Sequence, residues 1–316
     1  MIVDVHTHIW DSPQQLGPDA TERIRRSRGQ PWERPDASVK SHEEAMKPVQ
    51  VAIVLGFVSQ RLGANVGADQ VAACVARGPD KLFGFAGIDP MANDYLEQYD
   101  RALELGLSGV TISPAGQDFH PCHTHAQALY ERCESKGLPV MVHPGAQFSS
   151  ASVMEFAQPH LFDDVARDFP KLRIVLAQVG HPWIDPALAL VGKHPHVWAD
   201  LSDLVLRPWQ LYTTLLAAHQ QGVMDHLLLG SDFPFCTPQQ AITTIYSINT
   251  YTQGTNLPSV PREQLRGIVE RDALACLGLR GMAPSGAEDA EQHTDEKVPE
   301  EAKAMAPSAD ASATGD

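Results

Sequence analysis

The sequence predicts an α/β fold, a (β/α)8 TIM barrel over residues 1–280 with a long loop after its first strand and a disordered tail over 281–316. Three observations predict it: apolar runs alternate with helical patterns, the runs number eight, and the alternation stops near Leu279. Most runs are continuous stretches of Val, Ile and Leu, as expected for parallel strands buried on both faces. Eight strand–helix units in about 280 residues fit a single barrel.

The expected elements follow in order along the chain. The apolar runs predict strands over 2–5, 51–56, 82–88, 109–112, 139–143, 173–177, 197–201 and 226–230. The intervening patterns predict helices over 70–77, 94–105, 126–136, 162–169, 186–193, 209–221 and 262–277. Gly or Pro stands at most of the joints, where it interrupts regular structure.

The segment 10–41 is too long for an ordinary connection between a strand and a helix. It carries Trp10 and a group of arginines that includes Arg25 and Arg26 in an otherwise acidic chain. One interpretation is a solvated helix face. The other is a lid over the barrel mouth, whose arginines attract a carboxylate-bearing substrate.

Composition limits the classes of function. The net charge of −15 argues against nucleic acid as a partner, and no apolar run is long enough for a membrane-spanning helix. Residues 286–316 contribute −7 of that charge and contain few large apolar side chains, which predicts disorder. The five scattered Cys and the lack of a signal-peptide pattern favour a cytoplasmic location. A small molecule is the expected partner, with a homodimer as the assembly to test.

His6 and His8 are the first candidates for metal ligands. Residues i and i+2 of a strand point to one side, so both imidazoles at the end of the first strand can reach one ion. In a barrel of this kind the active site lies at the carboxyl ends of the strands. His143 follows the fifth strand and Asp232 the eighth, so all four side chains converge on the mouth. His143 as an ordinary buried histidine, and Asp232 as a helix N-cap, are the alternatives.

Three or four such ligands with one position left for water are the pattern of catalytic zinc. The expected cofactor is therefore one divalent metal ion, with Zn²⁺ preferred. A second group, His120, Cys122, His123 and His125, lies in a loop before a helix and is interpreted as structural.

The chain resembles the amidohydrolase superfamily, in particular the amidohydrolase-related group that includes aminocarboxymuconate-semialdehyde decarboxylase. The resemblance covers about residues 1–280 and rests on four motifs: Asp4-Val5-His6-Thr7-His8, Gly137-Leu138-Pro139-Val140-Met141-Val142-His143, Gly180-His181-Pro182-Trp183 and Gly230-Ser231-Asp232-Phe233-Pro234. It implies a TIM barrel, one divalent metal held by His6, His8, His143 and Asp232, and either hydrolysis or non-oxidative decarboxylation.

Two positions depart from the pattern of the family. Many relatives carry His where this chain has Gln178, and Lys where it has Thr111. A Gln side chain can orient water by hydrogen bonding but cannot carry a proton. His181, three residues on, either takes over that role or only shapes the turn before Trp183. Without the Lys, the arginines of segment 10–41 would have to neutralise a substrate carboxylate.

These features predict a metal-dependent hydrolase that acts on a small, carboxylate-bearing substrate. Asp232 would accept a proton from water, with His181 or Gln178 orienting that water. Trp10, Trp183 and Phe235 follow strand ends that carry site residues and would line a pocket for an apolar or aromatic acid. The alternatives are a decarboxylase of an aromatic or unsaturated acid and a catalytically impaired metal-binding protein.

Overall fold

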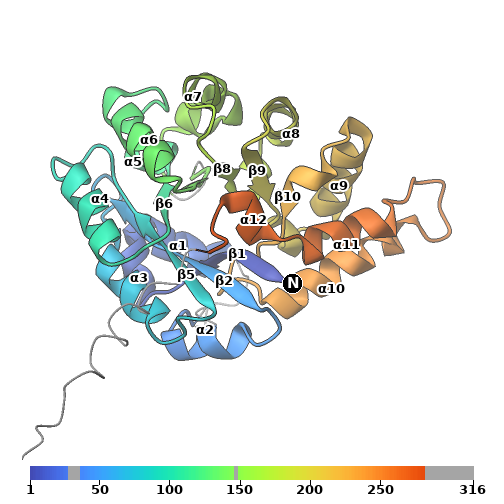
Figure 1. Ribbon diagram of the computed structural model, residues 1–316. Coiled ribbons are helices and arrows are strands. Elements are labelled where there is room, and N and C mark those ends of the chain that lie inside the picture. The colour runs from blue at the N-terminus through green and yellow to red at the C-terminus, as the bar shows by residue number, and fades with distance from the viewer. Residues whose placement is uncertain (28–35, 146–148, 282–316) are drawn as a thin grey trace, which may run out of the picture.

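The eight parallel strands of one sheet form the centre of the molecule, and helices surround them (Figure 1). The computed structural model describes residues 1–27, 36–145 and 149–281, with side chains described up to residue 22 in the first range. The strands, in the order in which they pair, are β1 (Val3–His8), β2 (Val51–Leu55), β5 (Leu82–Gly87), β6 (Gly109–Ile112), β7 (Val140–Val142), β8 (Ile174–Leu176), β9 (Val197–Asp200) and β10 (Leu227–Leu228).

Backbone hydrogen bonds join the first strand to the segment that follows the last one. Val5 N donates to Leu229 O and His8 N to Phe233 O, each over 2.9 Å. Asp232 N donates to His6 O, also over 2.9 Å. These bonds bring the two edges of the sheet together, so the predicted eight-stranded barrel is confirmed. They also place the end of β1 directly beside Asp232.

Most of the helices lie outside the strands and run between their ends, whereas α12 lies over one end of the barrel (Figure 1). They are α1 (Pro18–Ser27), α2 (Val39–Ala45), α3 (Ala68–Val75), α4 (Tyr95–Glu104), α5 (Pro114–Gln117), α6 (Thr124–Lys136), α7 (Phe162–Asp168), α8 (Ile184–Lys193), α9 (Pro208–Gln221), α10 (Pro238–Ser247), α11 (Arg262–Glu270) and α12 (Ala273–Leu277). A separate antiparallel pair, β3 (Phe57–Ser59) and β4 (Ala64–Val66), follows β2.

The prediction of a single helix over 262–277 is wrong, because the structure has two helices there, α11 and α12. Arg271 between them has an extended backbone, with φ −60° and ψ 138°. The Asp272 side chain then accepts a hydrogen bond from Ala275 N over 3.1 Å and caps α12. An Asp that bonds the backbone locally competes with a continuous helix, which is why the chain turns here.

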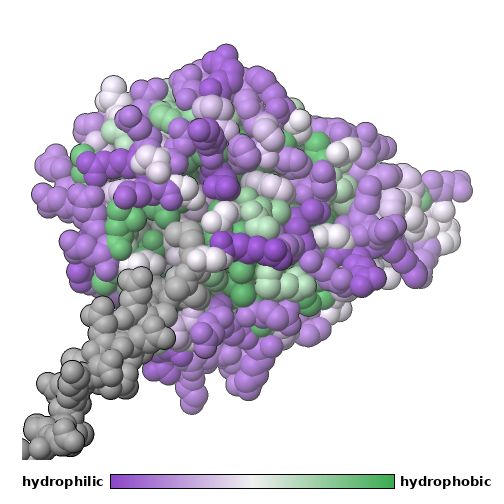
Figure 2. Space-filling model, viewed as in Figure 1, coloured by the Kyte–Doolittle hydropathy of each residue, from purple (hydrophilic) through white to green (hydrophobic). Residues whose placement is uncertain are grey.

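The break lets α12 cover one end of the barrel. Its Ala273, Leu274 and Leu277 pack with the inward-facing side chains of the strands, among them Val5 and Met141. The larger apolar cluster fills the layer between the strands and the surrounding helices. The surface seen from the side of Figure 1 is mainly hydrophilic, with hydrophobic residues in separate patches (Figure 2). None of the described helices combines the length and apolar character needed to cross a bilayer.

Two sequence predictions concern residues outside the described part. The acidic tail lies almost wholly in 282–316, and the side chains of Arg25 and Arg26 lie beyond residue 22, where the described side chains of the first range end. Segment 10–41 itself is not one loop, because it contains a 3₁₀ helix, Pro13–Leu16, as well as α1 and the start of α2.

Candidate metal centre

A bulge in β1 aims two histidines into the barrel. The register between β1 and β2 shifts between Asp4 and Thr7. Val5 belongs to the inner apolar cluster, and in a regular strand Thr7 would face the same way. Thr7 instead bonds outward, to Ile53 O over 2.7 Å and to His42 of α2 over 2.9 Å. An extra residue in one strand re-aims the side chains beyond it, so His6 and His8 point into the mouth.

Three histidines form a compact group at that mouth. The ligand atoms of His6, His8 and His143 all lie within 4.8 Å of one another. His6 Nε2 is 3.1 Å from His8 Nε2, and the His6 and His143 ring centroids are 4.8 Å apart. His143 comes from the end of β7, where His143 N donates to Ile112 O over 2.9 Å. The side chains therefore meet from opposite parts of the barrel.

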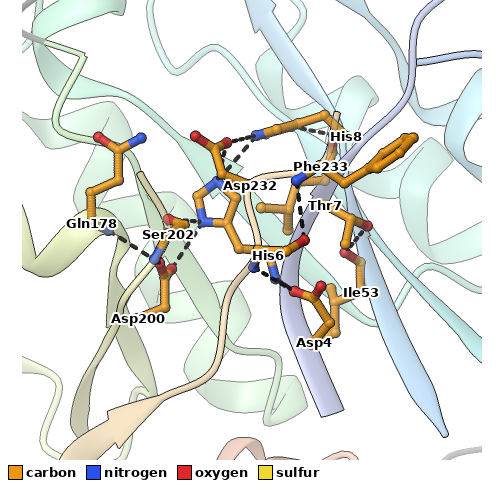
Figure 3. A network of polar contacts seen from close by, with 12 residues as sticks. Asp4, His6, Thr7, His8, Ile53, Gln178, Asp200, Ser202, Asp232 and Phe233 are labelled. Atoms are coloured by element: carbon orange, nitrogen blue, oxygen red, sulfur yellow. Dashed lines mark hydrogen bonds and ion pairs between the residues drawn. The ribbon is translucent and has the colours of Figure 1, made fainter. Parts of the chain in front are cut away.

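Asp232 adds a carboxylate to the same group. Its Oδ1 lies 3.6 Å from His6 Nε2 and 3.5 Å from His8 Nε2 (Figure 3). Asp232 has a left-handed backbone with φ 62°, uncommon outside glycine, and it sits in the turn after β10. The alternative role as a helix N-cap is wrong, because Thr237 caps α10 by accepting from Gln240 N.

This donor set fits a divalent transition metal. His143 Nε2 is buried and has no hydrogen-bond partner among the residues that the structure describes, which is costly unless the nitrogen binds something. Burial, helped by the positive potential of His6 and His8, holds the pKa of His143 well below its usual range, so its imidazole is neutral. Neutral imidazoles beside a carboxylate are ligands that zinc and similar ions accept.

Asp200, at the end of β9, fixes the ring of His6. His6 Nδ1 donates to Asp200 Oδ2 over 2.9 Å, and both side chains are fully buried (Figure 3). Asp200 Oδ1 accepts from Gln178 N over 3.2 Å and from Ser202 N over 2.9 Å. Because Nδ1 carries the proton, Nε2 is left free to bind a metal.

Burial and charge act in opposite directions on His6. Burial disfavours its charged form, but the Asp200 and Asp232 carboxylates outweigh this and raise the pKa of His6. The same interaction with His6 overcomes the burial of Asp200 and lowers the pKa of Asp200. Asp200 therefore keeps its negative charge, and the proton on His6 Nδ1 points toward its carboxylate.

Asp4 anchors the two chain segments that carry the site. Its Oδ1 accepts from His6 N over 3.2 Å and from Ser231 N over 3.0 Å, and the residue is fully buried. Burial raises the pKa of Asp4 to about 6. The carboxyl group thus ties β1 to the turn that presents Asp232.

Gln178 and His181 lie in the turn after β8, a 3₁₀ segment spanning Ala177–Gly180. Gln178 has φ 58°, and its carboxamide extends on the same side as the Asp232 carboxylate (Figure 3). His181 N donates to Gln178 O over 3.0 Å, and the His181 side chain is largely buried. Burial, and then the nearby Arg207, lower the pKa of His181, so its ring is neutral at pH 7.

Two of the three aromatic residues predicted to bind substrate pack together near the site. The Trp10 ring lies 6.5 Å from that of His8 and 5.9 Å from that of Phe235, centroid to centroid. Trp183 precedes α8 and is half-buried, with no ring contact recorded among the described residues. The side chains of Arg25 and Arg26 lie outside the described part, so their predicted role is untested.

Sequence reasoning missed Asp200, Ser202 and His42. Asp200 lies within the predicted strand 197–201 and was not identified as a site residue. An acidic residue at the carboxyl end of a barrel strand is nevertheless a signal for the site. His42 lies on a helix that the sequence pattern did not predict. Within 1–27, 36–145 and 149–281, the three histidines form the one group able to hold a metal, so the loop of His120 and Cys122 offers no second site.

Comparisons with known proteins agree with this geometry. The family model described as amidohydrolase matches residues 3–279. No curated protein matches the chain.

Among solved structures, a zinc-bound amidohydrolase from Burkholderia multivorans aligns at 15% identity over 88% of this chain and 99% of its own, with TM-score 0.63. A probable 2-pyrone-4,6-dicarboxylic acid hydrolase from Acinetobacter baumannii with bound citric acid aligns at 16% identity over 88% and 99%, with TM-score 0.60. A dihydroxybenzoic acid decarboxylase from a Polaromonas species, with manganese and an inhibitor, aligns at 15% identity over 88% and 97%, with TM-score 0.55.

Proposed function

Since this chain belongs to the amidohydrolase family, we propose that it is a metal-dependent hydrolase of a small, carboxylate-bearing substrate. The proposal depends on one observation: three histidine imidazoles and one carboxylate lie together at the barrel mouth. His6, His8, His143 and Asp232 would hold one divalent ion, zinc by preference. When bound, such an ion activates water and polarises a carbonyl group.

Asp232 is the proposed proton acceptor. Its Oδ1 faces His6 and His8, and no described residue forms a hydrogen bond with its Oδ2. Oδ2 is therefore free to take a proton from a water molecule and pass it to the leaving group. Gln178 would orient that water through its carboxamide, because an amide donates and accepts hydrogen bonds but does not change its protonation state.

His181 is the second proposed acid–base group. Its lowered pKa keeps the ring neutral at pH 7, so it can accept a proton rather than supply one. Trp10 and Phe235 would supply an apolar wall beside His8. The citric acid and the dicarboxylic acid substrate named for one structural neighbour support an anionic ligand for this chain as well.

Decarboxylation of an aromatic or unsaturated acid is the alternative. The paired rings of Trp10 and Phe235 favour it, since they suit a flat aromatic acid. A family neighbour of that activity supports it too. A third alternative is a metal-binding protein with impaired catalysis, because Gln178 stands where many relatives use His.

Two assays on the zinc-loaded protein separate these functions. The first follows hydrolysis of a carboxylated lactone and of mono-4-nitrophenyl esters of dicarboxylic acids. The second follows CO2 release from dihydroxybenzoates. Hydrolysis without CO2 release, abolished by Asp232→Asn, is the expected result. CO2 release alone would establish the decarboxylase, and metal binding with no turnover in either assay would establish the impaired protein.

A further inference from the structure

Two segments without charged residues lie on one side of the molecule, namely α9 and the stretch that contains α10 and the loop after it. Residues 233–261 are 29 successive residues without Asp, Glu, Lys, Arg or His. The first four of these types make up 20% of the chain, so 29 residues would be expected to carry about six of them. Helix α9 lacks all four as well. The loop between α10 and α11 projects from this side of the molecule (Figure 1).

Large apolar side chains are concentrated on the same segments. Seven large apolar side chains are exposed among the described residues, and five of them lie within 206–257. The rings of Trp209, Tyr212 and Tyr251 contact one another, with centroids 5.7, 5.9 and 6.1 Å apart. Trp209 is 53% exposed, Tyr251 39% and Leu257 40%. We call these four residues the aromatic patch.

Hydrogen bonds hold the aromatic patch in a fixed shape. The Tyr212 hydroxyl donates to Pro258 O over 2.7 Å, which places Leu257 beside the rings. Asn249 Nδ2 donates to Val260 O over 2.8 Å, and Asn249 Oδ1 accepts from Val260 N over 2.9 Å. These bonds close the loop near both of its ends. A surface that is already ordered loses less entropy when a partner covers it.

The charge of the chain indicates which partner fits the aromatic patch. Aromatic residues are enriched and charged residues depleted in the cores of protein–protein interfaces. The net charge is −15, so two copies of the chain repel each other where their acidic surfaces meet. A face without charge avoids that repulsion. Arg207, two residues before Trp209, adds no net charge beside the patch, because Asp203 pairs with it over 3.0 Å.

Other occupants match the aromatic patch less well. The acidic segment 286–316 carries −7 and few large apolar side chains, and the patch offers it no cation. An anionic lipid surface attracts Lys and Arg, which are absent from both 208–224 and 233–261. A second copy presents the same neutral rings, and in a two-fold contact the same patch serves both partners.

We propose that the aromatic patch is the contact surface of a homodimer, in which Trp209 and Tyr251 of one copy pack against the same patch of the other. The dimer does not depend on the reaction at the metal centre. Trp209 and Tyr251 are the expected anchors, since Trp and Tyr are common among the residues that contribute most to binding at interfaces.

The oligomeric state of the full chain tests this surface. Sedimentation equilibrium of the zinc-loaded protein should give a dimer of about 69 kDa, twice the 34.4 kDa of one chain. Trp209→Glu and Leu257→Glu each place a carboxylate against the patch of the partner. Each should raise the dissociation constant of the dimer about 30-fold or more, as for the loss of an interface hot spot. Leu257 lies in an exposed loop, so its variant keeps the test valid if Trp209→Glu fails to fold, which circular dichroism would reveal.

Met154→Glu is the matched control, because it adds the same charge at a side chain that is 58% exposed and lies before α7. Its dissociation constant should stay within about twofold of wild type. Raising NaCl from about 0.05 to about 0.5 M should leave the dimer equally tight or tighter, since salt screens the repulsion between two acidic chains.

Four results would overturn the proposal. They are a wild-type monomer at about 100 μM, a dimer that survives both patch variants, an equal loss in Met154→Glu, and a dimer that weakens as salt is added. A wild-type monomer that binds vesicles of phosphatidylcholine and phosphatidylserine, with that binding lost in Trp209→Glu, would assign the patch to a membrane surface instead.

Discussion

Replacing Asp200 by Asn should weaken metal binding without removing any proposed ligand. The His6 Nδ1 to Asp200 Oδ2 hydrogen bond is 2.9 Å long between two fully buried groups. The Asp200 carboxylate also accepts from the backbone of Gln178 and Ser202. An Asn amide has one acceptor oxygen, so either His6 or the two backbone N–H groups must face an NH₂ group.

If the amide nitrogen faces His6, the proton of the ring moves from Nδ1 to Nε2, and Nε2 can no longer bind a metal. Partners of this kind typically contribute 10- to 100-fold to metal affinity, which corresponds to about 1.4–2.7 kcal/mol. We expect a loss in that range, measured by competition with a fluorescent zinc chelator. Circular dichroism would check that the variant stays folded.

Asp163→Asn is the control for this experiment. Asp163 also accepts from a histidine, His194 Nε2, over 2.7 Å, but Asp163 lies on α7 and His194 directly follows α8. Its zinc affinity should stay within about twofold of wild type. Zinc affinity of Asp200→Asn equal to wild type, or an equal loss in Asp163→Asn, would refute the role assigned to Asp200.

Three further perturbations test other parts of the site. Asp232→Asn should reduce turnover by at least about 100-fold, because it removes the proposed proton acceptor, and a variant with kcat near wild type in steady-state assays would exclude that role. Burial lowers the pKa of His42 to about 4, so the metal-free protein should lose stability as pH falls from 6.5 through about 4. The loss should reach about 2 kcal/mol at pH 5 in urea titrations and be smaller in His42→Gln, whereas equal pH slopes would contradict it. Removal of the metal with a chelator should lower Tm, and added Zn²⁺ should restore it, whereas a Tm independent of metal would count against the site.

The barrel could be predicted from the sequence because each strand is an uninterrupted buried apolar run. The eight predicted strands match the observed ones within a few residues, and the largest shift is at β1, which runs on to His8. Short elements without such a pattern escaped prediction: β3 and β4 have three residues each, and α2 has seven. The division of 262–277 depends on the capping bond of Asp272, a contact that apolar periodicity does not report.

The meeting of the four side chains at the mouth could also be predicted, because the carboxyl ends of barrel strands share one face. What holds those side chains in place could not be predicted from strand order alone. The β1 bulge, the Asp200–His6 hydrogen bond and the left-handed turns at Gln178 and Asp232 arise from packing between strands far apart in sequence.

The central claim is that His6, His8, His143 and Asp232 hold one divalent metal. It is tested most directly by anomalous diffraction at the zinc edge from crystals of the zinc-loaded protein. We predict one strong peak at about 2.0–2.2 Å from an imidazole nitrogen of each histidine and from an Asp232 oxygen. The absence of a peak among these side chains, or a zinc ion bound by other residues, would contradict the account.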